Sequence, residues 1–487
     1  MELNIPAAVE GGDFGDLGST FDGFLYTDVD EFRKALTSGY GTDAASYTQG
    51  RALQFESLEP SLIATIQERG KHFPLFDKLE KGNATSVVDQ YTTKDAIGGF
   101  PGGATNTETG TISEQTGTYA RKTRNVKYLM TMRTVSAVQR ATDAQVEAMA
   151  IENEDAILEL LSTAEWLFFN GDSSIVATEF DGIEKELTDN ATSDHILDLR
   201  GQSVTAEAAE IVDSAAFVAS FENFGSITDA WTSKLVGADF DKKLDPAHRV
   251  AIDGKAQSIQ LGTPVRGITT ADGDIALNRD VFIQEGQMPF VGRGGKYATN
   301  AASGNTAAPQ SAAGVAAVNA SSQFVAATAG LYYYAVEGVN RLGRSTLVKS
   351  AQVAVAAGES VTLTITESVA GTETGYVIHR CTKNGSNGNT DFREMCRVAK
   401  TGGGTTVYVD HNQNIPGTSK IYLLNMERGA RAINLRRLLP LTRFNLFPTN
   451  TATYPWAQLL FLYLRVAKPK QHRIVKNVLP SGALWTP

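Results

Sequence analysis

Hydrophobic residues recur every three or four positions along a stretch that starts near residue 142. The recurring positions, which would form one stripe on a helix, are Val146, Met149, Ala150, Ile157, Leu160, Leu161, Ala164, Leu167 and Phe168. This spacing predicts a long amphipathic helix over 142–169. Thr142 or Asp143 can cap its N-terminus through a side-chain oxygen, and Gly171 suits a left-handed C-cap.

The stretch before this helix has little hydrophobic patterning and is rich in glycine and threonine between 82 and 125. A compact domain rarely carries so long a loop without secondary structure. Alternating apolar residues then predict a strand over 126–138, with Val126, Tyr128, Met130 and Met132 on one face. Together these patterns predict a two-stranded excursion that leaves the body and returns. We expect neighbouring subunits to bury it.

Two later regions differ in pattern. Alanine-rich helical spacing predicts a second helical region over 205–235, broken near 223–225. After an Ala/Ser/Gly-rich linker, short apolar runs separated by turn residues occur at 323–326, 331–337, 352–355, 361–365, 375–382 and 405–410. This repetition predicts a small β-sandwich. Apolar runs at 459–466 and 473–479 predict strands near the C-terminus.

Composition narrows the function classes. A chain of 487 residues exceeds one hydrophobic core, so two or three domains are expected. The net charge of −10 argues against nucleic-acid binding by the chain as a whole. Two cysteines and six scattered histidines predict neither a disulfide framework nor a metal site. We see no secretory signal and no apolar run long enough to span a membrane, so we expect a soluble protein without membrane contact.

The sequence offers no strong catalytic signature, and we expect neither enzymatic activity nor a cofactor. The run at 292–297 is similar to a phosphate-binding loop, but Phe290 stands where that loop needs a glycine, and Tyr297 stands where it needs a hydroxyl residue that can bind magnesium. His248 lies near Asp245 and Asp253, yet an isolated histidine beside acids is more often structural.

Four basic residues lie at the C-terminal end of the Gly-rich stretch. We call them the basic cluster: Arg121, Lys122, Arg124 and Lys127. One interpretation is a solvated strand edge, where lysine also blocks unwanted strand pairing. The other is an ion-pair zone through which the loop lies over an acidic neighbour, such as the glutamate-rich side of the predicted helix. Both interpretations remain open, and exposed pairs contribute little individually.

The order of these parts resembles that of tailed-bacteriophage major capsid proteins with the Hong-Kong-ninety-seven fold. That family has an N-terminal arm, an extended loop, a spine helix, a peripheral domain and an axial domain. The end of the predicted helix, Trp166-Leu-Phe-Phe-Asn-Gly-Asp172, looks like the ending common in that family. The segments at 224–228 and 237–240 look like its peripheral domain. The resemblance implies an α+β fold.

The runs at 331–340, 375–380 and 407–410 resemble strands of a fibronectin type III or immunoglobulin-like module. The two resemblances together divide the chain into consecutive parts. These are the N-terminal arm and lead-in helix (1–80), the extended loop (81–138), the peripheral domain with the spine helix (139–247), the first axial part (248–304), the inserted immunoglobulin-like domain (305–420), the second axial part (421–452) and the C-terminal strands of the peripheral domain (453–487).

The resemblance to the capsid family implies a structural role. Subunits would form pentamers and hexamers that close into the icosahedral shell of a virion around double-stranded DNA, after assembly in the host cytoplasm. Expected partners are the chain itself and scaffolding, portal and decoration proteins. Candidate intersubunit contacts are Phe100, Arg121, Lys122, Arg124 and Lys127. The alternatives are an encapsulin-like nanocompartment shell and a carbohydrate-binding virion adhesin.

Overall fold

The computed structural model describes residues 73–100, 102–112, 114–142, 147–205, 208–220, 223–243, 265–283, 286–287, 306–449 and 451–487. The expected N-terminal arm, the run at 292–297 and His248 lie outside these residues. The expected α+β class is confirmed by the helices and sheets described below.

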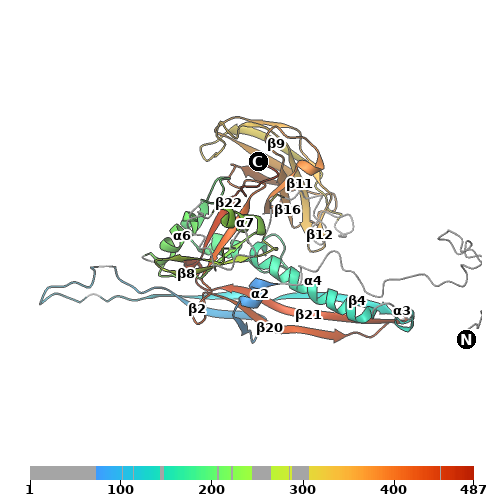
Figure 1. Cartoon of the computed structure of the whole chain (residues 1–487), viewed down its shortest axis with the longest axis horizontal. Helices are drawn as coiled ribbons and strands as arrows, with labels where there is room; N and C mark the ends of the chain where they lie inside the picture. The colour runs from blue at the N-terminus through green and yellow to red at the C-terminus, as the bar shows by residue number, and fades with distance from the viewer. Residues whose placement is uncertain are drawn as a thin grey trace, which may run out of the picture. The chain divides into compact units, whose positions relative to one another are not determined.

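The Gly-rich stretch forms a β-hairpin, which we call the arm hairpin (residues 88–125). Its strands β2 (Val88–Ala96) and β3 (Thr118–Asn125) pair antiparallel from Val88 opposite Asn125 to Ala96 opposite Thr118. In Figure 1 the arm hairpin projects away from the sheet that carries β20 and β21. The predicted two-stranded excursion is therefore confirmed for residues 88–125, whereas the strand predicted over 126–138 pairs with β21 in the body.

A four-stranded sheet has the order β1-β20-β21-β4. Its strands are β1 (Lys81–Asn83), β4 (Lys127–Ser136), β20 (Ile433–Asn445) and β21 (Thr453–Val466). The strand predicted over 126–138 is confirmed as β4. The predicted strand at 459–466 is also confirmed, as the second half of the longer β21.

The long helix α4 (Ala148–Asn170) covers one face of this sheet (Figure 1). It starts later than predicted because the chain first forms the short helix α3 (Ala137–Ala141), whose first turn is capped by the Ser136 hydroxyl accepting from the Gln139 amide. Gly171 is not the predicted left-handed cap, since its φ is −64°. Glycine fits there because a Cβ would lie 2.3 Å from the Phe180 carbonyl oxygen.

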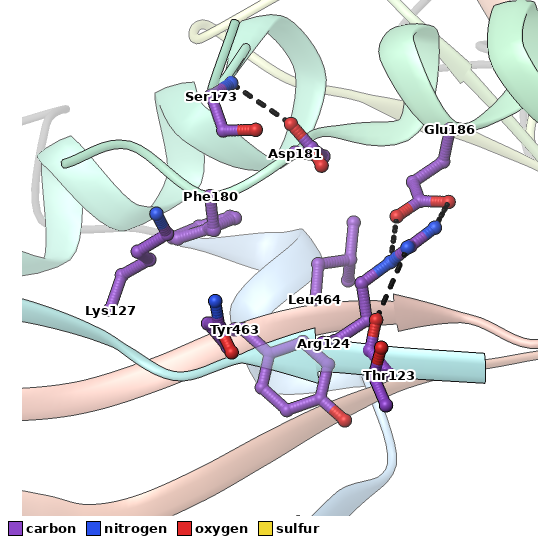
Figure 2. Close-up of a pocket in the computed structure, with 10 residues that line it drawn as sticks. Thr123, Arg124, Lys127, Ser173, Phe180, Asp181, Glu186, Tyr463 and Leu464 are labelled. Atoms are coloured by element: carbon purple, nitrogen blue, oxygen red, sulfur yellow. Dashed lines mark hydrogen bonds and ion pairs between the residues drawn. The ribbon is translucent and has the colours of Figure 1, made fainter. Parts of the chain in front are cut away.

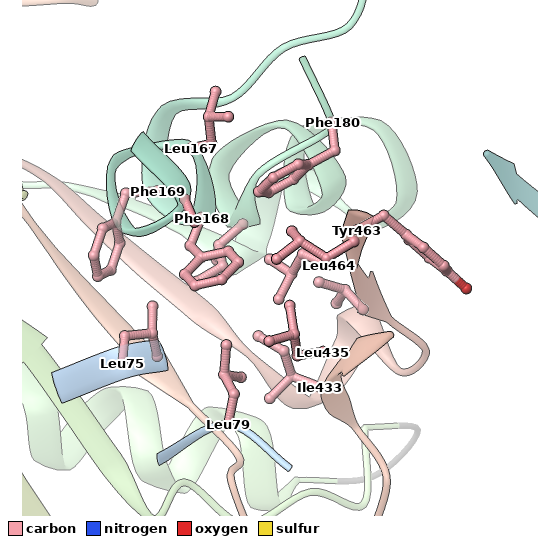
Figure 3. Packing of buried hydrophobic residues seen from close by; sticks show 14 of the residues in the cluster. Leu75, Leu79, Leu167, Phe168, Phe169, Phe180, Ile433, Leu435, Tyr463 and Leu464 are labelled. Carbon is pink, nitrogen blue, oxygen red and sulfur yellow. The ribbon is translucent and has the colours of Figure 1, made fainter. Parts of the chain in front are cut away.

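Aromatic residues at the end of α4 fill the core beneath it. Phe168 and Phe169 are fully buried and pack with Phe180, Leu464 and residues of α2 (Pro74–Lys78), as Figure 3 shows. Two hydrogen bonds hold α2 to α4. The Glu165 carboxylate on α4 accepts from the Leu75 and Phe76 amides at 2.7 and 2.9 Å.

A six-stranded sheet has the order β5-β22-β19-β6-β8-β7. Its strands are β5 (Ile196–Asp198), β6 (Asp229–Thr232), β7 (Gly267–Thr270), β8 (Gly273–Arg279), β19 (Ser419–Leu424) and β22 (Arg473–Val478). The neighbouring helices are α5 (Ile183–Asn190), α6 (Ala209–Ala219) and α7 (Lys234–Lys243). The helical prediction over 205–235 holds only for α6. Residues 229–232 instead form β6, which is buried throughout between β19 and β8.

Residues 306–412 form two facing sheets around a common core, as the short apolar runs predicted. One sheet contains β9 (Ser311–Val318), β15 (Glu359–Thr366) and β18 (Thr405–Asp410). The other contains β11 (Tyr334–Asn340), β12 (Gly343–Arg344), β13 (Val348–Lys349), β16 (Gly375–Arg380) and β17 (Arg393–Ala399). A smaller pair joins β10 (Gly330–Tyr332) to β14 (Val353–Val355). We call this region the sandwich; its immunoglobulin-like character remains a prediction.

The sandwich differs from the sequence prediction in several strands. Residues 323–326 form no strand, whereas β12, β13 and β17 were not predicted, and β9 begins in the stretch assigned to the Ala/Ser/Gly-rich linker. The β16–β17 pairing shifts register between Ile378 and His379, and β17 is mostly half-buried, so it lacks a clear alternation. The proposed division at 452/453 remains a prediction, and each flanking segment contributes strands to both the four-stranded and the six-stranded sheet.

Among the described helices, none combines the length and apolar character needed to cross a membrane.

Candidate intersubunit surfaces

The base of the arm hairpin is held to the body by an ion pair. The guanidinium of Arg124 donates from Nε and Nη2 to the two carboxylate oxygens of Glu186, at 2.7 Å each. Glu186 lies on α5 and is 1% exposed. Burial raises the pKa of Glu186, and Arg124 offsets part of that rise. Two parallel hydrogen bonds also fix the orientation of the side chains.

A second contact lies on the other strand of the hairpin. Asp89 accepts from Arg436 Nε on β20 at 2.9 Å and from the hydroxyl of Tyr463 on β21. Burial opposes ionisation of Asp89, but the hydrogen bonds from Arg436 and Tyr463, together with the nearby arginine charges, outweigh it and lower the pKa of Asp89. Both strands are therefore anchored at their base, so the hairpin leaves the body in a defined direction.

A cavity of about 180 Å³ lies beside these contacts. Figure 2 shows its lining, in which Arg124 points to Glu186, and the Asp181 carboxylate accepts from the Ser173 amide at 2.9 Å. Lys127 borders the cavity, and its ammonium group donates to the Ala177 carbonyl oxygen at 2.5 Å. The cavity is thus bounded by groups that hold the hairpin.

The structure separates the predicted basic cluster into two pairs. Arg124 and Lys127 bind groups of their own chain at the hairpin base, as just described. Arg121 is exposed opposite Thr92, and Lys122 is half-buried opposite Tyr91. An intersubunit role for all four remains a prediction.

Phe100 lies in the connection between the hairpin strands and is 71% exposed. Other large apolar side chains of the hairpin are also exposed: Ile97, Ile112 and Tyr119. Phe100 thus belongs to an apolar group far from the anchored base in the register of the two strands. Monomeric proteins seldom expose such a group without a partner for it.

Sequence reasoning did not assign a second apolar surface, which lies on the four-stranded sheet opposite α4. Residues of β4 alternate across the sheet: Arg133 pairs with Glu152 and Glu159 of α4, whereas Met130 and Met132 point the other way and are exposed. Their register partners on β21 are Leu459 and Ala457. We call this surface the apolar sheet face: Tyr128, Met130, Met132, Phe444, Leu459 and Phe461.

The alternation from Tyr128 to Met132 was visible in the sequence and predicted the strand. It did not reveal which face α4 covers, because that depends on packing between distant segments. A chain that leaves apolar side chains uncovered on a projecting hairpin and on a sheet face has the surfaces of an assembly subunit. The kind of assembly is indicated by the relatives of this chain.

The chain is similar over nearly its full length to phage capsid proteins. It is 22% identical over 473 residues to the major capsid protein of Staphylococcus phage S25-3, covering 91% of this chain and 94% of that protein. It is 28% identical over 267 residues to the putative major capsid protein of Enterococcus phage phiEF24C, covering 53% of this chain and 55% of that protein. The chain is a homologue of phage major capsid proteins, and the expected resemblance is confirmed. No family model matches it.

Solved phage capsids and encapsulins are similar to the chain at low identity. The holo-SrpI encapsulin complex from Synechococcus elongatus PCC 7942, for example, has a TM-score of 0.42 and 8% identity and covers 92% of this chain and 99% of that chain. Because these TM-scores are low, the capsid role rests on the sequence relatives. A capsid role is a structural one.

Proposed function

We propose that this chain builds the icosahedral head shell of a tailed phage from pentamers and hexamers that enclose double-stranded DNA. The near full-length similarity to a phage major capsid protein carries this proposal. The projecting arm hairpin supports it, because a two-stranded hairpin is marginal in water by itself. Assembly would take place in the host cytoplasm with scaffolding, portal and decoration proteins.

The contact between neighbouring subunits would join the two apolar surfaces described above. The arm hairpin of one subunit would lie on the apolar sheet face of the next, so that Phe100 and Ile112 cover Met130 and Met132. Phe100 and Ile112 on the hairpin and Met130, Met132 and Phe444 on the sheet face are exposed in the single chain, and burying them removes apolar area from water in both subunits. Arg121 and Lys122 would border this contact, while Arg124 and Lys127 keep the hairpin in its direction.

The sandwich would be an inserted module displayed on the shell, within the domain division given above. A nanocompartment with protein cargo would use the same subunit contacts. Extraction of particles from phage-producing cells distinguishes the two, since a phage head yields double-stranded DNA of uniform length and a nanocompartment yields protein cargo.

The direct test is electron microscopy of the full-length protein purified with and without a candidate scaffolding protein. Wild-type chain should give capsomers or closed shells, and Met132→Asp should prevent them by placing a carboxylate in the contact. Val369→Asp is the matched control, because Val369 is exposed in a turn of the sandwich. Shells formed equally well by Met132→Asp would contradict the proposed contact. A monomer under every condition would favour the adhesin alternative, which glycan-binding assays would then examine.

A further inference from the structure

Strand β9 lies at the edge of the sandwich. Its sheet has the order β18-β15-β9, and β9 pairs with β15 along its whole length, from Ser311 opposite Thr366 to Val318 opposite Glu359. Within the described ranges no strand pairs with its other side. Backbone N–H and C=O groups of this eight-residue strand therefore face outward along what we call the open edge.

The open edge lacks the features that normally protect an edge strand. Proteins usually place charged residues, proline or a bulge on such a strand to prevent pairing with other chains. The β9 sequence Ser-Ala-Ala-Gly-Val-Ala-Ala-Val contains neither charge nor proline, and its pairing with β15 runs without a bulge. Such an edge either promotes aggregation or serves as a binding surface for another strand.

The outer face of the same sheet is also uncharged. Side chains alternate along β9, so that Ala312 lies in the core whereas Ala313 and Val315 are exposed. The register places the following residues on the outer face: Ser311, Ala313, Val315, Ala317, Thr362, Thr364, Thr366, Thr405, Val407 and Val409. A strand added at the open edge would extend a flat surface of small and β-branched side chains.

The strand that fits this edge best is β9 of a second copy. Directly opposed residues of two paired strands lie on the same face of the sheet. In a two-fold pairing of β9 with itself, the axis must therefore pass through one residue and not between two. An axis at Gly314 or Val315 gives the longest overlap of the two strands. Every opposed pair then contains only Ala, Gly, Val or Ser, except at the strand end, where Gln310 opposes Val318 for an axis at Gly314 and Asn319 opposes Ser311 for an axis at Val315. No like charges meet, and small side chains let the two backbones approach. The arm hairpin fits less well, because Lys94, Arg121 and Lys122 occupy its strands.

We infer that β9 strands of two copies pair antiparallel about a two-fold axis, joining two sandwiches through a continuous six-stranded sheet. The interface is isologous, as in most homodimers. Backbone hydrogen bonds provide the attraction, and small outward side chains set the register. The inference rests on the proposed function in one respect: a shell supplies the many copies at high local concentration.

Cysteine crosslinking of the full-length protein tests this pairing. Val315→Cys places two thiols opposite each other if the axis passes Val315, and Ala313→Cys/Val315→Cys does so if it passes Gly314. Oxidation should give crosslinked dimers in both variants if the axis passes Val315, and in the double variant alone if it passes Gly314. Native Cys381 is buried and Cys396 is half-buried, so the wild type should remain uncrosslinked. Val407→Cys is the matched control, since Val407 lies on the same outer face but on β18 at the opposite edge.

A second variant tests how strongly the β9 pairing contributes to dimerisation. Val315→Lys should weaken dimerisation about fivefold, because a like charge then sits in or beside the opposing strand. Val407→Lys should leave it unchanged. Absence of a dimer in both cysteine variants, or equal dimerisation by Val315→Lys, overturns the inference.

The outcomes separate the inference from the proposed function. If shells form but neither cysteine variant crosslinks, the β9 pairing is contradicted and the capsid role is not. If crosslinked dimers form but the chain never forms shells, the pairing is supported and the capsid role is contradicted. Protection of the open edge by a different protein, with no crosslink between copies, would also overturn the inference.

Discussion

The arm hairpin and the sandwich are both built from short β-strands, yet they bury their side chains in opposite ways. In the sandwich, Tyr376, Ile378 and Leu363 are completely buried against residues of the same module. In the hairpin, Ile97, Phe100 and Ile112 are more than two thirds exposed. The sandwich thus obtains its hydrophobic stabilisation within the chain, whereas the hairpin leaves that surface for another chain.

Charged groups show the same difference. Arg380 lies inside the sandwich, where it donates to Asp410 at 2.7 Å and to Asn412 at 2.8 Å. The Tyr334 hydroxyl donates to the same Asp410 carboxylate at 2.8 Å, and burial raises the pKa of Tyr334 well above its usual range. Removing one partner of such a buried charge strongly destabilises the fold. In the hairpin the ion pairs of Arg124 and Asp89 lie at the base, and Arg121, farther along β3, is exposed.

Both regions are nevertheless fastened to the body. The sandwich is held through Arg397, whose guanidinium donates to the Asn170 carbonyl oxygen at 2.9 Å and lies over the Trp166 ring. The hairpin is held through Arg124 and Asp89. The hairpin and the sandwich are thus both attached to the body. They differ in the rest of their structure, because the sandwich buries its apolar side chains in its own core and the hairpin does not. Substitutions can test this separately for core, base and tip.

The largest effect is expected in the sandwich core. Phe392 is fully buried there, and Phe392→Ala removes most of its side chain and leaves a cavity. We expect a loss of roughly 3–5 kcal/mol of unfolding free energy. Chemical denaturation followed by tyrosine and tryptophan fluorescence would measure it. A loss below about 1 kcal/mol would mean that the sandwich does not depend on its own core, and the comparison would fail.

An intermediate effect is expected at the hairpin base. Arg124→Ala leaves the buried Glu186 carboxylate without its cation, which should cost about 2–3 kcal/mol at neutral pH. Burial already raises the pKa of Glu186, and removal of Arg124 raises it further. The folded pKa of this acid then lies above the unfolded value, so stability is lost as pH rises and is recovered toward acidic pH.

Denaturation of this variant between pH 5 and pH 8 would check the sign. Two controls keep the interpretation specific. Arg121→Ala should change stability by no more than about 0.5 kcal/mol. Arg124→Met combined with Glu186→Gln should lose less than Arg124→Ala, because no buried charge is left unpaired. A destabilisation that grows toward acidic pH would argue against the assigned role of Glu186.

The sequence allowed prediction of those features that repeat locally. Apolar spacing predicted α4, alternation from Tyr128 to Met132 predicted β4, and turn-separated runs predicted most sandwich strands. Local patterns failed where distant segments decide the outcome. Residues 229–232 continue an apolar helical region, but β19 and β8 on either side make them a strand.

The candidate surfaces show the same limit. Phe100 was predicted as a contact residue, and its ring is exposed in the connection between β2 and β3. The basic cluster was grouped because its members are close in sequence, yet Glu186 and the Ala177 carbonyl draw Arg124 and Lys127 to the body. The apolar sheet face required knowledge of which side α4 covers. The open edge of β9 required the strand order.

The smallest effect on the single chain is expected at the hairpin tip. Phe100→Ala should change the unfolding free energy by no more than about 0.5 kcal/mol, because the ring is already mostly in water. The same substitution should weaken subunit association by at least tenfold if the ring is buried between copies. Light scattering during assembly measures the second quantity, and Val369→Ala on the sandwich surface provides the control. Phe392→Ala and Phe100→Ala remove the same side chain, so a large loss of folding stability for Phe392→Ala and a large loss of association for Phe100→Ala would establish the division of roles. If Phe100→Ala instead left association unchanged, the exposed tip would have no partner of the proposed kind, and the hairpin would differ from the sandwich only in lacking a core.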